Sequence, residues 1–264
     1  MQPAKAFVKD DRITIAGISA LACILQDVLH EGLGHGVTAW LSGAHRVTLS
    51  TVALQSDIET RWIAANGTLV NLLFGAIFWL LLLRPQRYKP ATFYFLVLAM
   101  TGNLFTATGY FFFSGVANFG DWAAVIQGLQ PQWLWRVGLV VLGSGSYYAS
   151  MLIVGSKLRQ FYGTDQNPGR LRRLCWTPYI TDGVLAALAG LLNPAGLFYV
   201  VASALPSTLG ANAGLLSLPS LMQKWRRSEE PAGAITRSAG WIITGTLVSL
   251  LFIFILGRGI TWSR

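Results

Sequence analysis

The sequence predicts an all-α polytopic membrane protein with about seven transmembrane helices and a short β-hairpin after the first helix. Of its 264 residues, 53% are hydrophobic and only 12% are charged, whereas ordinary soluble domains carry roughly 25% charged residues. The mean hydropathy is +0.50. Several apolar runs approach or exceed the ~20 residues that an α-helix needs to cross a hydrocarbon core.

The apolar runs set the order of the elements. We expect the first helix at about 13–41, and the alternation of apolar and polar residues over 46–59 predicts the hairpin. Further helices are expected at about 62–83, 91–113 and 133–156, as a pair around the Asn193-Pro194 break that ends near 224, and at 241–256. No linker is long enough to separate a second domain, so residues 1–264 form a single integral membrane domain.

The basic residues predict how the chain is oriented. Lys5, Lys9 and Arg12 precede the first helix, which places the N-terminus in the cytoplasm by the positive-inside rule. With seven helices, the three basic loops fall on that same side, and the segments 42–61 and 114–132 emerge on the opposite face. This pattern predicts a multi-pass protein of a bacterial-type plasma membrane.

The net charge of +9 does not indicate nucleic-acid binding, because the basic residues lie in short loops between apolar runs, as in membrane proteins with cytoplasmic basic loops. The lipid bilayer is therefore the expected environment, and no nucleic-acid partner is predicted. Cys23 and Cys175 are too few for a disulfide framework or a zinc cluster of cysteines.

A chemical motif, His30-Glu31-Gly32-Leu33-Gly34-His35, lies in the last third of the first helix. Two histidines with a glutamate directly after the first are the components of a zinc hydrolase site, in which the imidazoles bind Zn²⁺ and the carboxylate acts as general base. A titratable residue within a membrane is a functional candidate by default. The alternative interpretation is a polar helix end with two interfacial histidines.

The spacing of the motif is one residue longer than H-E-x-x-H. Residues five apart diverge by roughly 140° around a regular α-helix, so His30 and His35 would not face one ion. A π-bulge absorbs one inserted residue, and Gly32 and Gly34 make such a departure from regular geometry inexpensive. The longer spacing resembles the His-Glu-Leu-Leu-Gly-His zinc motif of the dipeptidyl peptidase III family.

A catalytic zinc site takes three protein ligands. The two histidines supply two of them, and the acidic residues are the candidates for the third. Asp121 lies in the charge-poor segment on the non-cytoplasmic side, where the motif is also expected, and it is the favoured ligand. Asp182, expected to begin the fifth helix near the cytoplasm, is the alternative. Each of the two aspartates could instead be a helix N-cap.

Together with Gly67-Thr68-Leu69-Val70-Asn71, the histidine motif resembles the site-2 protease family of intramembrane zinc metalloproteases. That family has a Gly-x-x-x-Asn motif in a helix after a surface hairpin and, later, an Asp-Gly that supplies the last ligand. Asp121 matches the order of the third motif but precedes Trp122, whereas Asp182-Gly183 matches its letters but comes late. The resemblance covers roughly 13–125 and leaves 133–264 as additional transmembrane helices.

The resemblance implies a membrane-embedded zinc metallopeptidase that hydrolyses a peptide bond of a membrane-associated substrate. Glu31 would be the catalytic base, and Asn71 would position the substrate or, on spacing alone, pack between helices. Gln26 and Asp27 lie one turn before His30 and could hydrogen-bond its second ring nitrogen; Asp27 could equally face water or a packed polar neighbour. The competing hypothesis is a catalytically inactive protease-like scaffold or a transporter.

Overall fold

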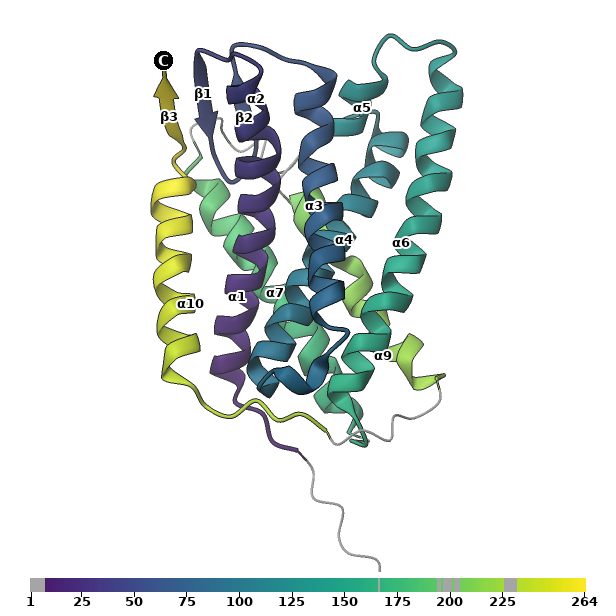
Figure 1. The fold of residues 1–264 in the computed structure, drawn as a ribbon, viewed down its shortest axis with the longest axis vertical. Coiled ribbons are helices and arrows are strands. Elements are labelled where there is room, and N and C mark those ends of the chain that lie inside the picture. The colour runs from purple at the N-terminus through teal and green to yellow at the C-terminus, as the bar shows by residue number, and fades with distance from the viewer. Residues whose placement is uncertain (1–7, 166, 194–195, 197–200, 202–204, 226–231) are drawn as a thin grey trace, which may run out of the picture.

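Long helices packed side by side form most of the protein (Figure 1). The computed structural model describes residues 8–264 except 166, 194–195, 197–200, 202–204 and 226–231. Within that part of the chain, six helices are long and apolar enough to cross a membrane. They are the rod α1–η1–α2 (Arg12–Leu41), α3 (Arg61–Leu81), α4 (Pro90–Ala117), α6 (Gln132–Tyr162), α7 (Pro168–Leu191) and α10 with η6 (Ala239–Leu256).

The pair of helices predicted around Asn193-Pro194 is confirmed only for its first member. Part of the second falls on residues outside those described. Its described part consists of the π-helical turn η4 (Pro206–Gly210), the 3-10 turn η5 (Ala211–Ala213) and the ten-residue helix α9 (Gly214–Gln223). A helix of ten residues is about 15 Å long, half the thickness of the hydrocarbon core.

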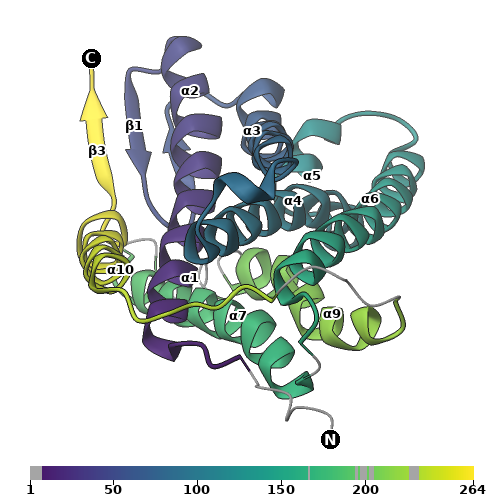
Figure 2. The same cartoon turned by 60° about the horizontal axis from the view of Figure 1, so that its bottom comes forward.

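The central helix is α4, which packs against α1, α3 and α6 (Figure 2). Most of its side chains are buried, and several of them belong to the largest hydrophobic cluster, including Tyr94, Met100 and Phe105. In contrast, α6 and α10 bury few residues and lie at the outside of the bundle. Their exposed leucines and valines suit contact with lipid.

The predicted hairpin is present and has a third strand that was not predicted. Strands β1 (Arg46–Leu49) and β2 (Leu54–Ser56) are antiparallel, and β3 (Ile260–Ser263) pairs antiparallel with the other edge of β1. Next to β1, the Asp57 carboxylate accepts hydrogen bonds from the amides of Arg46 (3.1 Å) and His45 (3.0 Å), which lower its pKa although burial opposes them.

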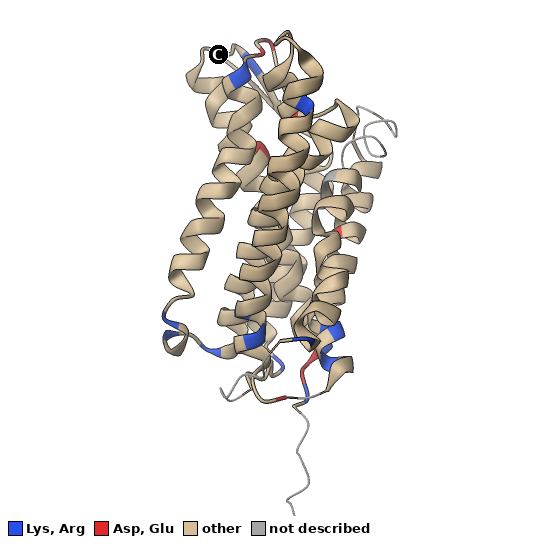
Figure 3. Ribbon diagram, turned by 90° about the vertical axis from the view of Figure 1, so that its right-hand side faces the viewer, with Lys and Arg blue, Asp and Glu red and all other residues tan. Residues whose placement is uncertain are grey.

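The sheet and the short helix α5 (Asp121–Ile126) lie at one end of the bundle, and the start of α1 lies at the other (Figure 1). The segments predicted to share a face therefore do so. Lys and Arg gather mainly at the end opposite the sheet (Figure 3), as the orientation rule expects. Which end faces the cytoplasm stays a prediction.

The basic residues at 170–173 were expected in a loop but form the first turns of α7. Asn167 caps this helix by accepting hydrogen bonds from the amides of Gly169 and Arg170, and Pro168 occupies the first helical position, as is common at helix starts. Asp182, predicted to begin the helix, lies more than three turns inside it.

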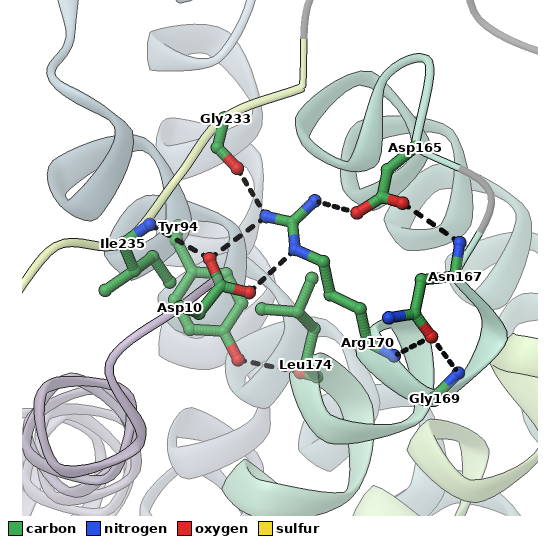
Figure 4. Close-up of polar contacts among 9 residues, drawn as sticks. All are labelled: Asp10, Tyr94, Asp165, Asn167, Gly169, Arg170, Leu174, Gly233 and Ile235. Atoms are coloured by element: carbon green, nitrogen blue, oxygen red, sulfur yellow. Dashed lines mark hydrogen bonds and ion pairs between the residues drawn. The ribbon is translucent and has the colours of Figure 1, made fainter. Parts of the chain in front are cut away.

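Arg170 is fully buried because two carboxylates and a carbonyl surround its guanidinium group (Figure 4). Nε and Nη2 donate to Asp10 (2.7 and 3.1 Å), Nη1 donates to Asp165 (3.1 Å), and Nη2 also donates to the Gly233 carbonyl. Asp10 in turn accepts a hydrogen bond from the Ile235 amide (3.0 Å). Through Asp10, this cluster joins the segment before α1 to the start of α7 and to the segment that leads into α10.

Candidate metal centre

The prediction of a π-helical distortion in the first helix is confirmed. Residues Val28–Gly36 form a π-helix, η1, between the α-helical segments α1 (Arg12–Asp27) and α2 (Val37–Leu41). The amide of Val37 bonds to the carbonyl of Gly32, five residues back. Hydrogen bonding over five residues places side chains five apart on one face, so His30 and His35 point to the same place.

Two glycines allow α3 to approach this π-helix closely. A Cβ atom on Gly34 would lie 2.5 Å from the Cα atom of Gly67, and a Cβ atom on Gly67 would overlap the His35 ring and lie 2.7 Å from Cε1 of His30. Both distances are shorter than Cβ contacts in proteins. The Gly67 motif thus has a physical role, since it gives the two imidazoles their space against α3.

Asp121 completes a group of three ligand atoms. Nε2 of His30 and Nε2 of His35 are 3.2 Å apart, and Oδ2 of Asp121 lies 3.2 Å from the first and 3.4 Å from the second. Asp121 reaches this place because Asn118 (φ 52°) and Gly120 (φ 83°) turn the chain back after α4. It is the first residue of α5, so the N-cap position belongs to Gly120.

The hydrogen bonds of the two histidines fix which ring nitrogen carries the proton. Nδ1 of His35 lies 2.6 Å from the carbonyl oxygen of Ile63, which can only accept, so Nδ1 donates. Nδ1 of His30 lies 2.6 Å from Oδ1 of Asn71, whose amide nitrogen donates to Asn103 and to the carbonyl of Gln26. Both Nε2 atoms therefore carry free lone pairs in the neutral imidazoles.

These tautomers make the group fit a metal ion. With both imidazoles neutral, three acceptor atoms face one another, and Oδ2 of Asp121 bonds to no other group among the described residues. Two ligands of a tetrahedral zinc ion with bonds of ~2.0–2.1 Å lie about 3.3 Å apart, which agrees with the three separations here. The residues His30, His35 and Asp121 thus have the donor set, burial and spacing of a zinc site.

A cleft of about 580 Å³ opens onto this group. Its lining includes Glu31, His35 and Asp121 together with Leu54 of β2, Arg61 at the start of α3 and Tyr110 of α4. Glu31 is buried, with 6% of its surface exposed. The ring of Tyr110 stacks on His30, with 4.9 Å between ring centroids and an angle of 21° between the planes.

The structure does not bring the alternative ligand, Asp182, into the group. Asp182 lies in the middle of α7, and its carboxylate accepts a hydrogen bond from Asn212 of η5 (2.7 Å). The expected partners of the second His30 nitrogen, Gln26 and Asp27, do not occupy that place either. Asn71 does, because the close approach of α3 inserts its side chain there, and Gln26 contributes only its backbone carbonyl.

Sequence reasoning missed Asn103 and Tyr110. Asn103 is fully buried in α4, where it accepts a hydrogen bond from Asn71 (2.7 Å) and donates one to the carbonyl of Ala99 (2.8 Å). An amide in the middle of a helix apolar enough to cross a membrane is a usable signal, because polar groups in a membrane are rare and need partners. Tyr110 has no comparable signal, since it stands among aromatic residues.

Comparison of this chain with family models, with curated proteins and with solved structures finds no match.

Proposed function

We propose that this chain is a membrane-embedded zinc metallopeptidase that hydrolyses a peptide bond of a membrane-associated substrate. The observation that carries the proposal is the convergence of His30, His35 and Asp121 in a cleft that also contains Glu31. Three ligands leave a fourth position open, as in catalytic zinc sites, whereas structural sites fill all four.

His30, His35 and Asp121 would hold the zinc ion through Nε2, Nε2 and Oδ2. When bound, the ion supplies Lewis-acid polarisation of a carbonyl oxygen and lowers the pKa of water toward 7. Asn71 and the Ile63 carbonyl orient the two imidazoles by accepting from their Nδ1–H groups. Such outer partners fix the ring orientation and raise the basicity of the ligand.

Glu31 is the residue proposed to move the proton. It directly follows His30, and its carboxylate lines the cleft beside His35 and Asp121. It would take a proton from the attacking water at a carboxylate oxygen and deliver it to the leaving amine, the role of a general base that becomes a general acid. Its burial excludes bulk water, which strengthens its electrostatic interactions.

The cleft also suits a peptide as substrate. It is lined on one side by β2 and the residues before it, and on the other by α5, and it carries Arg61 and Glu59 as charged groups. Such a mixture of apolar walls and few charges can take an extended segment whose remainder stays in the bilayer. The role of Asn71 in substrate positioning stays a prediction; its contacts here are with protein groups.

Metal content and cleavage together test the proposal. Purified full-length protein in detergent should contain about one zinc per chain, and His30→Ala and His35→Ala should lower that content strongly. Glu31→Gln should keep the metal yet abolish cleavage of a membrane-anchored reporter, because the amide cannot accept the proton. Cleavage by Glu31→Gln would refute the assigned base. A non-catalytic scaffold would bind zinc, but neither the wild-type protein nor Glu31→Gln would cleave the reporter.

A further inference from the structure

A second cavity also reaches Glu31. It has a volume of about 20 Å³, and its lining comes from α1, η1, α4, α7, η4, η6 and the turn between β1 and β2. Four of the side chains that line it have a buried oxygen without a hydrogen-bond partner among the residues described. These oxygens are Oδ2 of Asp27, Oε2 of Glu31, Oγ1 of Thr51 and Oγ1 of Thr106.

Thr106 differs from two other buried threonines of α4 in its hydrogen bonding. The other buried threonines of α4, Thr101 and Thr108, each donate to the carbonyl four residues earlier in their own helix, at 2.7 Å. Thr106 is equally buried, with 2% of its surface exposed, but its hydroxyl makes no such bond. A buried hydroxyl left without a partner costs about 1–3 kcal/mol, so its partner is expected in the cavity.

We propose that this cavity binds one internal water molecule, which ties Glu31 to Asp27, Thr51 and Thr106. The volume exceeds the ~10–15 Å³ that a single water requires, and a buried water makes 2–4 hydrogen bonds. The chemistry of the four oxygens is complementary to water. Two carboxylate oxygens accept its two hydrogens, and two hydroxyl groups donate to its two lone pairs.

A metal ion fits the cavity less well than water. A hard cation such as Ca²⁺ or Mg²⁺ needs at least six oxygen ligands at about 2.0–2.6 Å. Among the described residues, the acidic and histidine side chains that converge closely enough for an ion are His30, His35 and Asp121, and this group includes neither Asp27 nor Asp182. The carboxylates around the cavity thus do not form a group of three close enough to share one ion.

The water gives Thr106 and Thr51 a positioning role, a step that rests on the proposed function. Glu31 lines both cavities, so a water bound at Oε2 would hold the carboxylate from one side while it faces the cleft. The carboxylate is then fixed in the orientation in which it can take a proton from the attacking water. Without the hydroxyl groups the water loses two partners, and the Glu31 side chain loses its anchor.

Replacing Thr106 by valine tests the water site through the sign of a stability change. Valine has the same shape but no hydroxyl. If water is bound, Thr106→Val should lower the midpoint of thermal unfolding by about 2–4 °C relative to the wild-type protein, because the hydrogen bond from the hydroxyl to the water is lost. If the cavity is dry, removing an unpaired hydroxyl should raise the midpoint. A rise or an unchanged midpoint would overturn the proposal.

Hydrolysis of the membrane-anchored reporter tests the positioning role separately. Thr106→Val should lower kcat roughly 10-fold with little change in KM, a part of the ~10²–10⁴-fold that a positioned base contributes. Thr106→Ser, which keeps the hydroxyl, should restore kcat, and Thr108→Val should behave as wild type. Unchanged kcat in Thr106→Val would refute the positioning role. If the wild-type protein cleaves nothing while the stability order holds, the proposed function fails and the water site stands.

Discussion

Oδ1 of Asn71 accepts a 2.6 Å hydrogen bond from Nδ1 of His30, across 41 residues of sequence. The amide group of Asn71 is fully buried, and its nitrogen donates to Asn103 and to the Gln26 backbone. Because both donor positions of the amide are used, its oxygen can face only the imidazole. The orientation of the His30 ring, a proposed zinc ligand in the first helix, is thus set by amides of two other helices.

We predict that Asn71→Leu weakens zinc binding by about 10- to 100-fold, the usual effect of removing an outer partner of a histidine ligand. Asn71→Asp should keep most of the affinity, because a carboxylate still accepts from Nδ1–H. Competition with a chromogenic chelator measures both variants. Equal affinity in Asn71→Leu and wild type would show that the ring needs no such support.

Gly67→Ala should abolish zinc binding while the protein stays folded. The added methyl group overlaps the His35 ring and crowds His30, so the imidazoles must move apart. Gly138→Ala in α6 is the matched control, since a methyl group there meets nothing within 4 Å. Zinc content per chain, measured beside a thermal unfolding curve, distinguishes a lost site from a lost fold. A full zinc complement in Gly67→Ala would contradict the described approach of α3.

Comparing Asp121→Ala with Asp182→Ala tests the third ligand. Only the first should lose zinc, because Oδ2 of Asp121 lies 3.2 and 3.4 Å from the two Nε2 atoms, whereas Asp182 is bonded to Asn212. The metal content of the two purified variants decides between them. Loss confined to Asp182→Ala would refute the ligand set proposed here.

Arg170→Met should destabilise the protein by about 3–5 kcal/mol, since it leaves the buried carboxylates of Asp10 and Asp165 without their counter-charge. The midpoint of thermal unfolding should fall by on the order of 10 °C. Arg172→Met, an exposed change in the same turn, serves as the control. If both variants unfold at the same temperature, the cluster contributes nothing to stability.

Much of the site followed from local spacing. Because His30 and His35 are five residues apart, they can share one face only if the helix departs from α-helical geometry. The glycines between them tolerate a π-helical segment there, so both points concern one short stretch of sequence. Asp121 was favoured because it lies in a charge-poor segment on the same side of the membrane as the motif. Each inference needed only helix geometry and the count of membrane crossings.

What the sequence did not reveal depends on pairing between distant segments. The strand β3 is only four residues long, and its partner β1 lies more than 200 residues earlier, so alternation alone carries little signal. The start of α7 was placed too late because three arginines argue for a loop. Arg170 is inside only because Asp10 and Asp165 neutralise it, and no local pattern predicts that match.

The pairing of β3 with β1 has a consequence for biogenesis. The wall of the cleft formed by β2 belongs to a sheet whose strand β3 follows α10 and η6 in the chain. A ribosome makes β1 and β2 long before it makes β3, so β1 lacks one of its two partners until residues 260–263 have been synthesised. The sheet beside the histidines therefore reaches its final form late in synthesis, after α10 has been made.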